Sequence, residues 1–164
     1  MELLIVRHAI AWERDARRWP DDAARPLSPA GVLRARKAAA GLKALGSRPL
    51  RVLASPLARA RETAAILTRH AGWPAALECP ELAPGAEPEA LLAAIRRAGS
   101  MRIAVVGHEP DLGRLLGACL GGARPQAFAF RKMGAALVTF EGAAQAGKAR
   151  LEWLVPARIL RAAR

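Results

Sequence analysis

The sequence predicts an α/β protein in which strands and helices alternate along the chain. Short apolar runs such as 3–6 and 103–106 suit buried strands, and other segments repeat apolar residues at helical spacing. The 164 residues, 52% of them apolar and 24% charged, suit one globular domain with a sizeable core. With four Trp, three Phe and no Tyr, that core must consist mainly of aliphatic side chains. We therefore expect a layered α/β domain covering residues 1–164.

In the first half of the chain, caps and turn residues mark where the elements begin and end. We expect a strand at 2–6, a polar loop through Arg25, a helix from Ser28 to about Leu45, a strand at 51–54 and a helix that begins at Ser55. Ser-Pro pairs open both helices, because serine caps a helix start and proline suits the first turn. In the second helix one apolar stripe follows the 3.6-residue period, formed by Leu57, Ala60, Ala64 and Leu67.

In the second half, periodicity is the main signal. We expect a weak strand at 75–78, a helix at 89–98, a strand at 103–106, a helix that ends at Gly121-Gly122, a hairpin of strands at 135–140 and 149–154, and a basic C-terminal tail at about 156–164. The helix before Gly121 is the clearest, because its apolar residues follow the i, i+3, i+4, i+7, i+8 pattern of a face turned to a core. These residues are Leu112, Leu115, Leu116, Cys119 and Leu120.

The net charge of +12 raises the question of a nucleic-acid partner. The arginines are spread over every expected helix, and no aromatic side chains are interleaved with them for base stacking. No zinc-ligand spacing is present either. We therefore expect no specific nucleic-acid binding, and interpret the charge as solvated helix faces with a basic rim that steers acidic or phosphorylated partners.

The chain is expected to be cytoplasmic, with no membrane partner. Its apolar N-terminal run is four residues long, too short for a secretory signal, and nothing approaches the roughly 18 apolar residues of a membrane span. Cys79 and Cys119 could pair in one disulfide, but buried free thiols of a reducing compartment are the favoured interpretation. The sequence makes no prediction of the oligomeric state.

Polar groups suited to phosphoryl transfer follow the ends of three expected strands. These groups are Arg7-His8, the segment from Ser55 to Arg59, and Gly107-His108. Because ligands of open α/β sheets bind outside the carboxyl ends of the strands, the three segments are expected to meet in one crevice. Guanidinium groups match the oxygens of a phosphoryl group in a bidentate manner, and a neutral imidazole can attack phosphorus near pH 7. A second imidazole can donate to an equatorial oxygen.

Helix geometry supports a phosphate-binding role for Arg59. If Ser55 caps the helix, Arg59 lies one turn inside and its side chain leans back toward the helix N-terminus, where an anion is favoured. Arg61 points about 200° around the helix from Arg59, so it is not expected to share the site.

Three sequence blocks resemble the histidine phosphatase superfamily, which includes phosphoglycerate mutases. Leu4-Ile5-Val6-Arg7-His8-Ala9 is similar to its Arg-His-Gly signature, Ser55 to Ala64 to its second motif, and Val106-Gly107-His108 to its late histidine motif. The continuation Glu109-Pro110-Asp111-Leu112-Gly113, with Arg25 to Ser28 and Pro80-Glu81-Leu82, most resembles the SixA-type phosphohistidine phosphatases. The resemblance spans about residues 2–155.

This resemblance implies a three-layer α/β/α sandwich around a mixed, mostly parallel sheet, with no metal and no cofactor. It implies that His8 is the nucleophile that becomes phosphorylated, and that Arg7, Arg59 and His108 bind the phosphoryl group. Glu81 is a candidate general acid, with a solvated loop carboxylate as the alternative. Ala9 departs from the family's usual glycine, and is tolerable only where the local φ is negative.

The function expected is hydrolysis of phosphohistidine in proteins. A phosphatase for a small phosphate ester, such as a sugar phosphate or a nucleotide, is the enzymatic alternative, and a catalytically inactive phosphate-binding module is the alternative from another class. Each site residue also has a structural interpretation, as a satisfied strand-end histidine, an ion-paired arginine or a helix cap. His70 is interpreted as a helix C-terminal residue, and Trp12 and Trp19 as packing residues.

Overall fold

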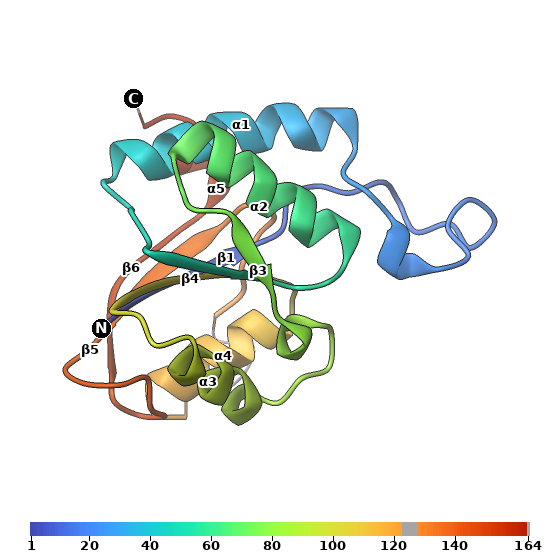
Figure 1. Cartoon of the computed structure of the whole chain (residues 1–164). Coiled ribbons are helices and arrows are strands. Elements are labelled where there is room, and N and C mark those ends of the chain that lie inside the picture. The colour runs from blue at the N-terminus through green and yellow to red at the C-terminus, as the bar shows by residue number, and fades with distance from the viewer. Residues whose placement is uncertain (123–127, 164) are drawn as a thin grey trace.

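The computed structural model describes residues 1–122 and 128–163, which form a six-stranded sheet covered by helices (Figure 1). The strands are β1 (Glu2–Arg7), β2 (Arg51–Ala54), β3 (Ala76–Glu78), β4 (Arg102–Gly107), β5 (Ala135–Phe140) and β6 (Ala149–Val155). Their order is β3-β2-β4-β1-β5-β6. The first four strands of this order pair in parallel, whereas β5 pairs antiparallel with both β1 and β6. The predicted mixed, mostly parallel sheet is confirmed.

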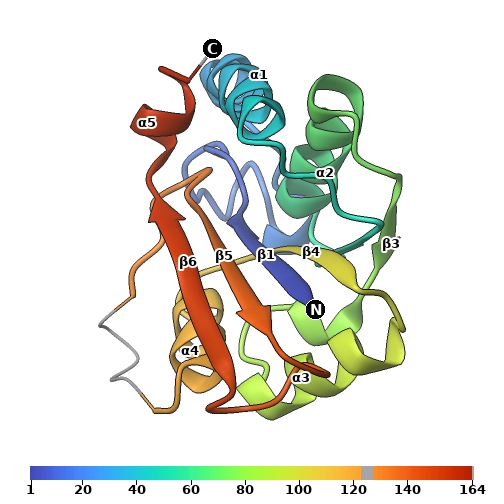
Figure 2. The same ribbon diagram turned by 90° about the vertical axis from the view of Figure 1, so that its left-hand side faces the viewer.

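Helices lie on both faces of the sheet and give three layers (Figures 1 and 2). The α-helices are α1 (Pro29–Ala44), α2 (Ala58–Ala71), α3 (Pro88–Arg97), α4 (Asp111–Cys119) and α5 (Ala157–Leu160), and the short 3-10 helices are η1 (Asp22–Ala24) and η2 (Pro80–Leu82). In the figures α1, α2 and α5 cover one face, and α3 and α4 cover the other. The α/β/α sandwich implied by the sequence is therefore confirmed.

The alternation of side chains along β1 divides the interior into two cores. Leu3 and Ile5 pack in the core that contains residues of α3 and α4. Leu4 and Val6 point the other way and pack in the core that contains residues of α1, α2 and α5. All four side chains are buried, so the strand that leads to the candidate nucleophile is fixed from both faces.

The second helix begins later than the sequence predicts. Its first residue is Ala58 and its N-cap is Leu57, whose apolar side chain makes no capping bond. Ser55 is fully buried, and its hydroxyl bonds to His108. The prediction of Ser55 as the helix cap was therefore wrong, because a side chain from a neighbouring strand end binds this hydroxyl.

Part of the expected basic tail is a short helix docked on α1. Leu160 of α5 is fully buried, and the chain approaches Gly41 so closely that a Cβ there would lie 1.9 Å from the Leu160 carbonyl oxygen. Glycine at position 41 is what permits this backbone contact. The segment carries charged residues such as Arg158 on its exposed side, while Ala157 and Leu160 are buried.

Both cysteines are buried in the core next to α3 and α4, and both are free. Burial raises the pKa of the Cys79 thiol to about 11 and that of the Cys119 thiol to about 12, so neither is a reactive thiolate near pH 7. The interpretation as free thiols is confirmed. In the part of the chain described, no helix has the length and apolar character needed to cross a bilayer.

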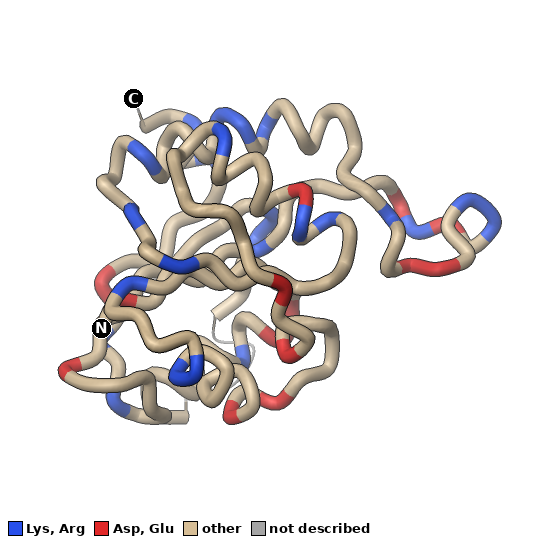
Figure 3. The backbone as a smooth tube through the Cα atoms, viewed as in Figure 1, with Lys and Arg blue, Asp and Glu red and all other residues tan. Residues whose placement is uncertain are grey.

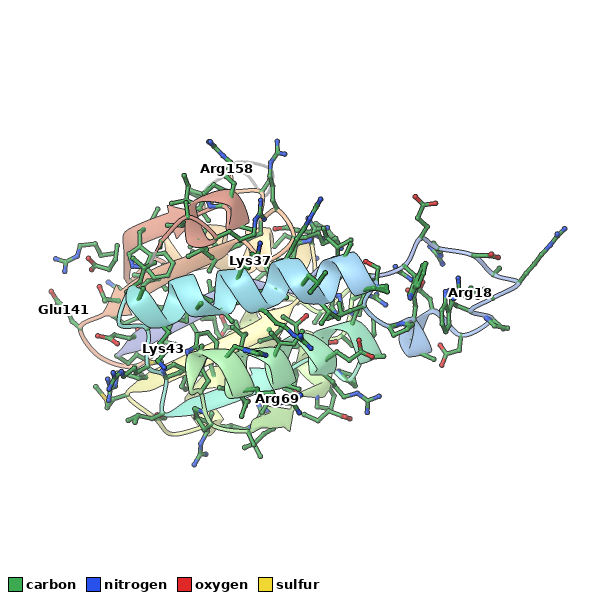
Figure 4. All side chains as sticks on the ribbon, turned by 90° about the horizontal axis from the view of Figure 1, so that it is seen from above. Arg18, Lys37, Lys43, Arg69, Glu141 and Arg158 are labelled. Carbon is green, nitrogen blue, oxygen red and sulfur yellow. The ribbon has the colours of Figure 1, made fainter. Side chains whose placement is uncertain are left out.

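Lys and Arg are spread along the whole chain and do not form one block, as the sequence predicts (Figure 3). Lys37 and Lys43 on α1, Arg69 on α2 and Arg158 on α5 are exposed and lie on the outside of this helical layer (Figure 4). Long cationic side chains in such positions stay solvated.

Candidate active site

The sheet brings three of the predicted polar segments to one edge. Arg7 at the end of β1 is in register with Gly107 at the end of β4, and Ala54 at the end of β2 is in register with Val106. The chain continues to pair one residue further, since the His8 amide donates to the Gly107 carbonyl (3.0 Å) and the Ser55 amide to the Val106 carbonyl (2.9 Å). His8, Ser55 and His108 thus start from adjacent positions at the carboxyl edge of the parallel strands.

His8 is held in one tautomer. Its Nδ1 lies 2.7 Å from the carbonyl oxygen of Ala9, which can only accept, so Nδ1 carries the proton. The lone pair is then on Nε2. Burial and the neighbouring charges of Lys132, His108 and Arg59 lower the pKa of His8 to about 2. The imidazole is neutral at pH 7, and Nε2 is its nucleophilic atom.

His108 lies beside the first imidazole, with ring centroids 4.9 Å apart. Its Nε2 is 2.8 Å from Ser55 Oγ, while its buried Nδ1 has no hydrogen-bond partner among the described residues. Burial, followed by the positive charges of Arg59, Lys132 and Arg7, lowers the pKa of His108 to about 3. The ring is therefore neutral and presents this nitrogen inside a strongly cationic environment.

The two predicted arginines approach this pair from different directions. Arg59 is the second residue of α2, and its Nη1 donates to the Asp22 carbonyl (2.9 Å) while Nη2 lies 3.2 Å from Asp22 Oδ2. Arg7 donates through Nη1 to the carbonyl of Phe130 (2.6 Å), and its buried Nε has no partner within residues 1–122 and 128–163. Burial lowers the pKa of both guanidinium groups, although they stay charged at any working pH.

Ala9 fits the position where the family usually has glycine. Among the residues the structure describes, Met133 alone combines a side chain larger than hydrogen with a positive φ, so the backbone at Ala9 is not in the left-handed region. Its methyl group is fully buried in the core beside α2. Its amide donates to Thr63 Oγ1 (3.0 Å), whose hydroxyl donates to the Arg59 carbonyl (2.7 Å). The condition set by the sequence, a φ that is not positive, is met.

The loop that continues from Ala9 is attached to α2 at both ends. Thr63 holds the Ala9 amide, and the neighbouring Glu62 accepts the amide proton of Leu27 through Oε2 (2.8 Å). Between these points residues 10–26 form a loop that projects from the sheet edge in Figure 1. Arg25 within it donates to Asp22 (2.8 Å), the same residue that holds Arg59.

The two tryptophans of this loop pack around an arginine. The Arg18 guanidinium carbon lies 4.3 Å from the centre of the Trp12 ring and 5.2 Å from that of Trp19. Cation–π contacts of this kind hold a solvated loop in shape, which agrees with their interpretation as packing residues. His70 lies in the last turn of α2, remote in the fold from the other two histidines.

Glu81 lies away from the two imidazoles. Its carboxylate accepts from Arg97 of α3 and from the Cys79 thiol (3.3 Å). A bond to its own backbone amide, followed by those to Cys79 and Arg97, holds the pKa of the carboxyl below its ordinary range. None of the hydrogen bonds found among residues 1–122 and 128–163 joins Glu81 to Arg7, His8, Arg59 or His108. The structure gives this carboxylate an ion-paired position on η2.

Lys132 is a site residue that the sequence reasoning missed. It lies in the turn before β5, and its Nζ is 2.9 Å from His8 Nε2. Because β5 runs antiparallel to β1, the residues that precede β5 arrive at the edge where β1 ends. The sequence predicts the site from residues that directly follow strands. Lys132 instead lies just before the start of β5. The feature of the sequence that could have indicated this residue is a lysine three residues before the first strand of the predicted hairpin at 135–140.

The arrangement can bind and attack a tetrahedral anion. Neutral Nε2 of His8 lies among the fixed charges of Arg7 and Arg59 and the ammonium of Lys132. Beside it lie the two buried nitrogens, on Arg7 and His108, that have no partner in the described part of the chain. Phosphoryl transfer requires such charge-stabilising donors around an in-line nucleophile.

Comparison with known proteins agrees with this chemistry. The model of the histidine phosphatase superfamily (branch 1) matches residues 3–83, which include Arg7, His8 and Arg59. An uncharacterised protein of Picosynechococcus sp. is 39% identical over 116 residues, 69% of each chain.

Two solved structures are similar over nearly the whole chain. The protein histidine phosphatase SixA, in complex with tungstate, has a TM-score of 0.83 and 28% identity, covering 98% of this chain and 99% of its own. A SixA protein from Nakamurella multipartitia has a TM-score of 0.72 and 28% identity, covering 93% of this chain and 94% of its own.

Proposed function

The chain belongs to the histidine phosphatase superfamily, and from this membership and the geometry around His8 we propose that it hydrolyses phosphohistidine in proteins. One observation carries the proposal. His8 Nε2, the unprotonated nitrogen of a neutral imidazole, lies next to Lys132, and the pair of imidazoles that it forms with His108 lies among the charges of Arg59 and Arg7. Such an arrangement suits a nucleophile that attacks phosphorus within a charge-neutralising pocket.

In the first step His8 Nε2 attacks phosphorus in line, and the bond between phosphorus and the substrate imidazole breaks. Arg7 and Arg59 neutralise the charge on the non-bridging oxygens. His108 donates to one of these oxygens through Nδ1, the nitrogen that Ser55 leaves free. In the second step water attacks the phosphohistidine at position 8, which releases inorganic phosphate and restores the neutral imidazole of His8.

A protein substrate is favoured by the surroundings of the site. Between α2 and β4 the chain forms only the short elements β3, η2 and α3 within residues 72–101, without a long insertion (Figure 1). The similarity to the protein histidine phosphatase SixA, over 98% of this chain, supports the same choice. We place the reaction in the cytoplasm, where the free thiols Cys79 and Cys119 remain reduced.

Trapping of the intermediate tests the mechanism. Brief incubation with a labelled phosphodonor is expected to leave acid-labile, alkali-stable phosphate on His8. His8→Ala should remain folded, take no label and turn over no substrate. His70→Ala is the matched control, because His70 is the histidine outside the site, and it should label like the wild type. Label on another residue, or no label during demonstrated turnover, rejects the mechanism.

A substrate panel tests the proposed specificity. Turnover of a phosphohistidine protein is compared with that of sugar phosphates and nucleotides, and kcat/KM is expected to be highest for the phosphohistidine protein. A strong preference for the small esters would overturn the choice of substrate and leave the role of His8 intact. A wild type without any turnover would indicate an inactive phosphate-binding module.

A further inference from the structure

Lys132 is fixed next to the nucleophile by its own backbone. The amide of Met133 donates to the Arg7 carbonyl (3.1 Å), and the Arg7 amide donates to the Gly134 carbonyl (3.1 Å). The turn therefore continues the pairing of β5 with β1 and keeps position 132 at the end of β1. From there the half-buried side chain reaches His8, with Nζ on the lone-pair side of Nε2 at 2.9 Å.

This position is the one from which phosphorus must approach. Reacting atoms in a near-attack geometry lie about 3 Å apart, so the ammonium group has to move aside when a phosphoryl group binds. A lysine stem is flexible enough to do so while Nζ stays beside the phosphoryl oxygens. In an in-line attack, the departing atom lies on the side of phosphorus that faces away from His8. Lys132 approaches His8 Nε2 from this same outer side, where phosphorus and its leaving group have to lie.

A substrate imidazole whose other ring nitrogen is unprotonated needs a proton as it departs, since it would otherwise leave as an unstable anion. Few groups near Nε2 can supply one. The guanidiniums of Arg7 and Arg59 do not give up protons at working pH. His8 and His108 are neutral, with pKa values of about 2 and about 3, and hold no acidic proton near pH 7.

The carboxyl groups of Glu81 and Asp22 form hydrogen bonds and ion pairs with other residues, which disfavours them as the proton donor. Glu81 bonds to Arg97 and Cys79, and Asp22 bonds to Arg59 and Arg25. Glu109 accepts the amide proton of Phe130 through Oε1 (2.7 Å), although burial raises the pKa of its carboxyl and makes it the rival that an experiment must separate.

Lys132 has the required acidity. Burial, together with the positive charges of Arg7, Arg59 and Arg25, lowers the pKa of its ammonium to about 8, although the charge of Glu109 acts in the opposite direction. A group with this pKa is protonated at pH 7 and loses its proton far more easily than an exposed lysine.

We propose that Lys132 is the acid–base residue of the reaction. As the bond between His8 Nε2 and phosphorus forms and the bond between phosphorus and the substrate nitrogen breaks, the Lys132 ammonium gives its proton to that departing nitrogen. The resulting amine then takes a proton from the water that attacks phosphorus, so that the ammonium is restored when the bond to His8 breaks. The assignment rests on the proposed phosphatase function and deepens it.

A series of leaving groups tests the assignment. In Lys132→Met, kcat/KM is measured for p-nitrophenyl phosphate, whose leaving group needs no proton, and for phenyl phosphate, whose leaving group does. The fold loss for phenyl phosphate is expected to exceed that for p-nitrophenyl phosphate by about 100, the ordinary contribution of a general acid. Lys37→Met, which removes an exposed lysine of α1, should change neither value (Figure 4). Equal losses for both esters, or no loss, would overturn the assignment.

Two further measurements keep the test independent of how one variant folds. Lys132→Arg keeps the charge but holds its proton too tightly, and it should show the same leaving-group dependence as Lys132→Met. In the wild type, kcat/KM for phenyl phosphate should fall as the pH rises through about 8, where Lys132 loses its proton. Absence of that decline counts against Lys132. A leaving-group-dependent loss in Glu109→Gln, without one in the Lys132 variants, would assign the acid to Glu109.

The aryl esters also separate the two proposals. If the wild type hydrolyses them and ignores a phosphohistidine protein, the proposed substrate is wrong while the leaving-group dependence still decides the role of Lys132. If it hydrolyses phosphohistidine and the leaving-group dependence is absent, the proposed function stands and the assignment of Lys132 falls.

Discussion

Ser55 is the hydrogen-bond partner of Nε2 of His108. The Leu57 amide donates to Ser55 Oγ (3.4 Å), which leaves the hydroxyl proton free to donate to His108 Nε2 at 2.8 Å. A hydroxyl that donates to Nε2 requires the ring proton on Nδ1, the buried nitrogen that has no partner among the residues described. A serine whose position predicts a helix cap is in this way a positioning residue for the imidazole that follows β4.

Ser55→Ala is expected to lower kcat/KM about tenfold, which corresponds to one hydrogen bond of about 1.4 kcal/mol. The variant removes the donor to Nε2, so that His108 exchanges between tautomers and presents its Nδ1 proton part of the time. The change in kcat/KM is measured by steady-state kinetics with a phosphate ester that the wild type hydrolyses. Ser100→Ala, just before the distant start of β4, is the control. Wild-type kinetics in Ser55→Ala would show that the bond to Ser55 has no part in the reaction.

Arg59→Lys is expected to weaken inhibition by inorganic phosphate by about two orders of magnitude. Lysine keeps the positive charge but lacks the planar fork that can bond to Asp22 and to the anion at the same time. Arg61→Lys on the exposed face of the same helix is the matched control and should bind phosphate as the wild type does. Equal affinities of the two variants would remove Arg59 from the phosphate-binding set.

Ala9→Gly should reduce stability and leave the chemistry in place. The bonds to Thr63 and His8 use backbone atoms of residue 9, which glycine retains. Loss of a fully buried methyl group and gain of freedom in the unfolded chain together cost about 1–2 kcal/mol. Urea unfolding should show this loss while kcat/KM stays within about twofold. A large rise in activity would instead mean that the Ala9 methyl group obstructs the nucleophile.

Acid is expected to destabilise the fold through the two buried histidines. Their pKa values of about 2 and about 3 lie well below the ordinary 6.5 of an unfolded chain. Between about pH 3 and pH 6.5 the unfolded state therefore binds more protons than the folded state. The contribution of the two histidines to the free energy of unfolding is complete above pH 6.5 and is lost as the pH falls below it. The slope per histidine is at most about 1.4 kcal/mol per pH unit.

Urea titrations between pH 7 and pH 4 measure this slope. His108→Gln is expected to reduce this slope by the contribution of one histidine, because glutamine binds no proton in either state. The same slope in the wild type and the variant would mean that His108 is not held neutral by its surroundings.

Much of the site could be predicted because its parts come directly after parallel strands. Arg7, His8 and His108 continue from apolar runs, and parallel strands place such residues at one edge whatever their separation in sequence. Their tautomers and pKa values could not be predicted, because they depend on Ser55, Ala9 and burial. Side-chain partners of this kind are set by tertiary packing.

Lys132 and the C-terminal helix were missed for different reasons. Lys132 precedes its strand, and only the antiparallel pairing of β5 with β1 carries it to the nucleophile. The C-terminal helix is four residues long and has too little periodicity to register, and it is stabilised by its contact with Gly41. Both features depend on contacts between segments far apart in sequence.

The attachment of the 10–26 loop at Glu62 and Thr63 bears on how substrate recognition could diversify. Thr63 and Glu62, on one turn of α2, accept hydrogen bonds from the two ends of the loop. The Thr63 hydroxyl also donates to the carbonyl of Arg59. Insertions or exchanges within the loop would alter the surface offered to a visiting protein, while the distance between the attacking nitrogen and its guanidinium stays the same. Replacement of this loop alone would therefore change which proteins the enzyme recognises and leave the positions of His8 and Arg59 unchanged.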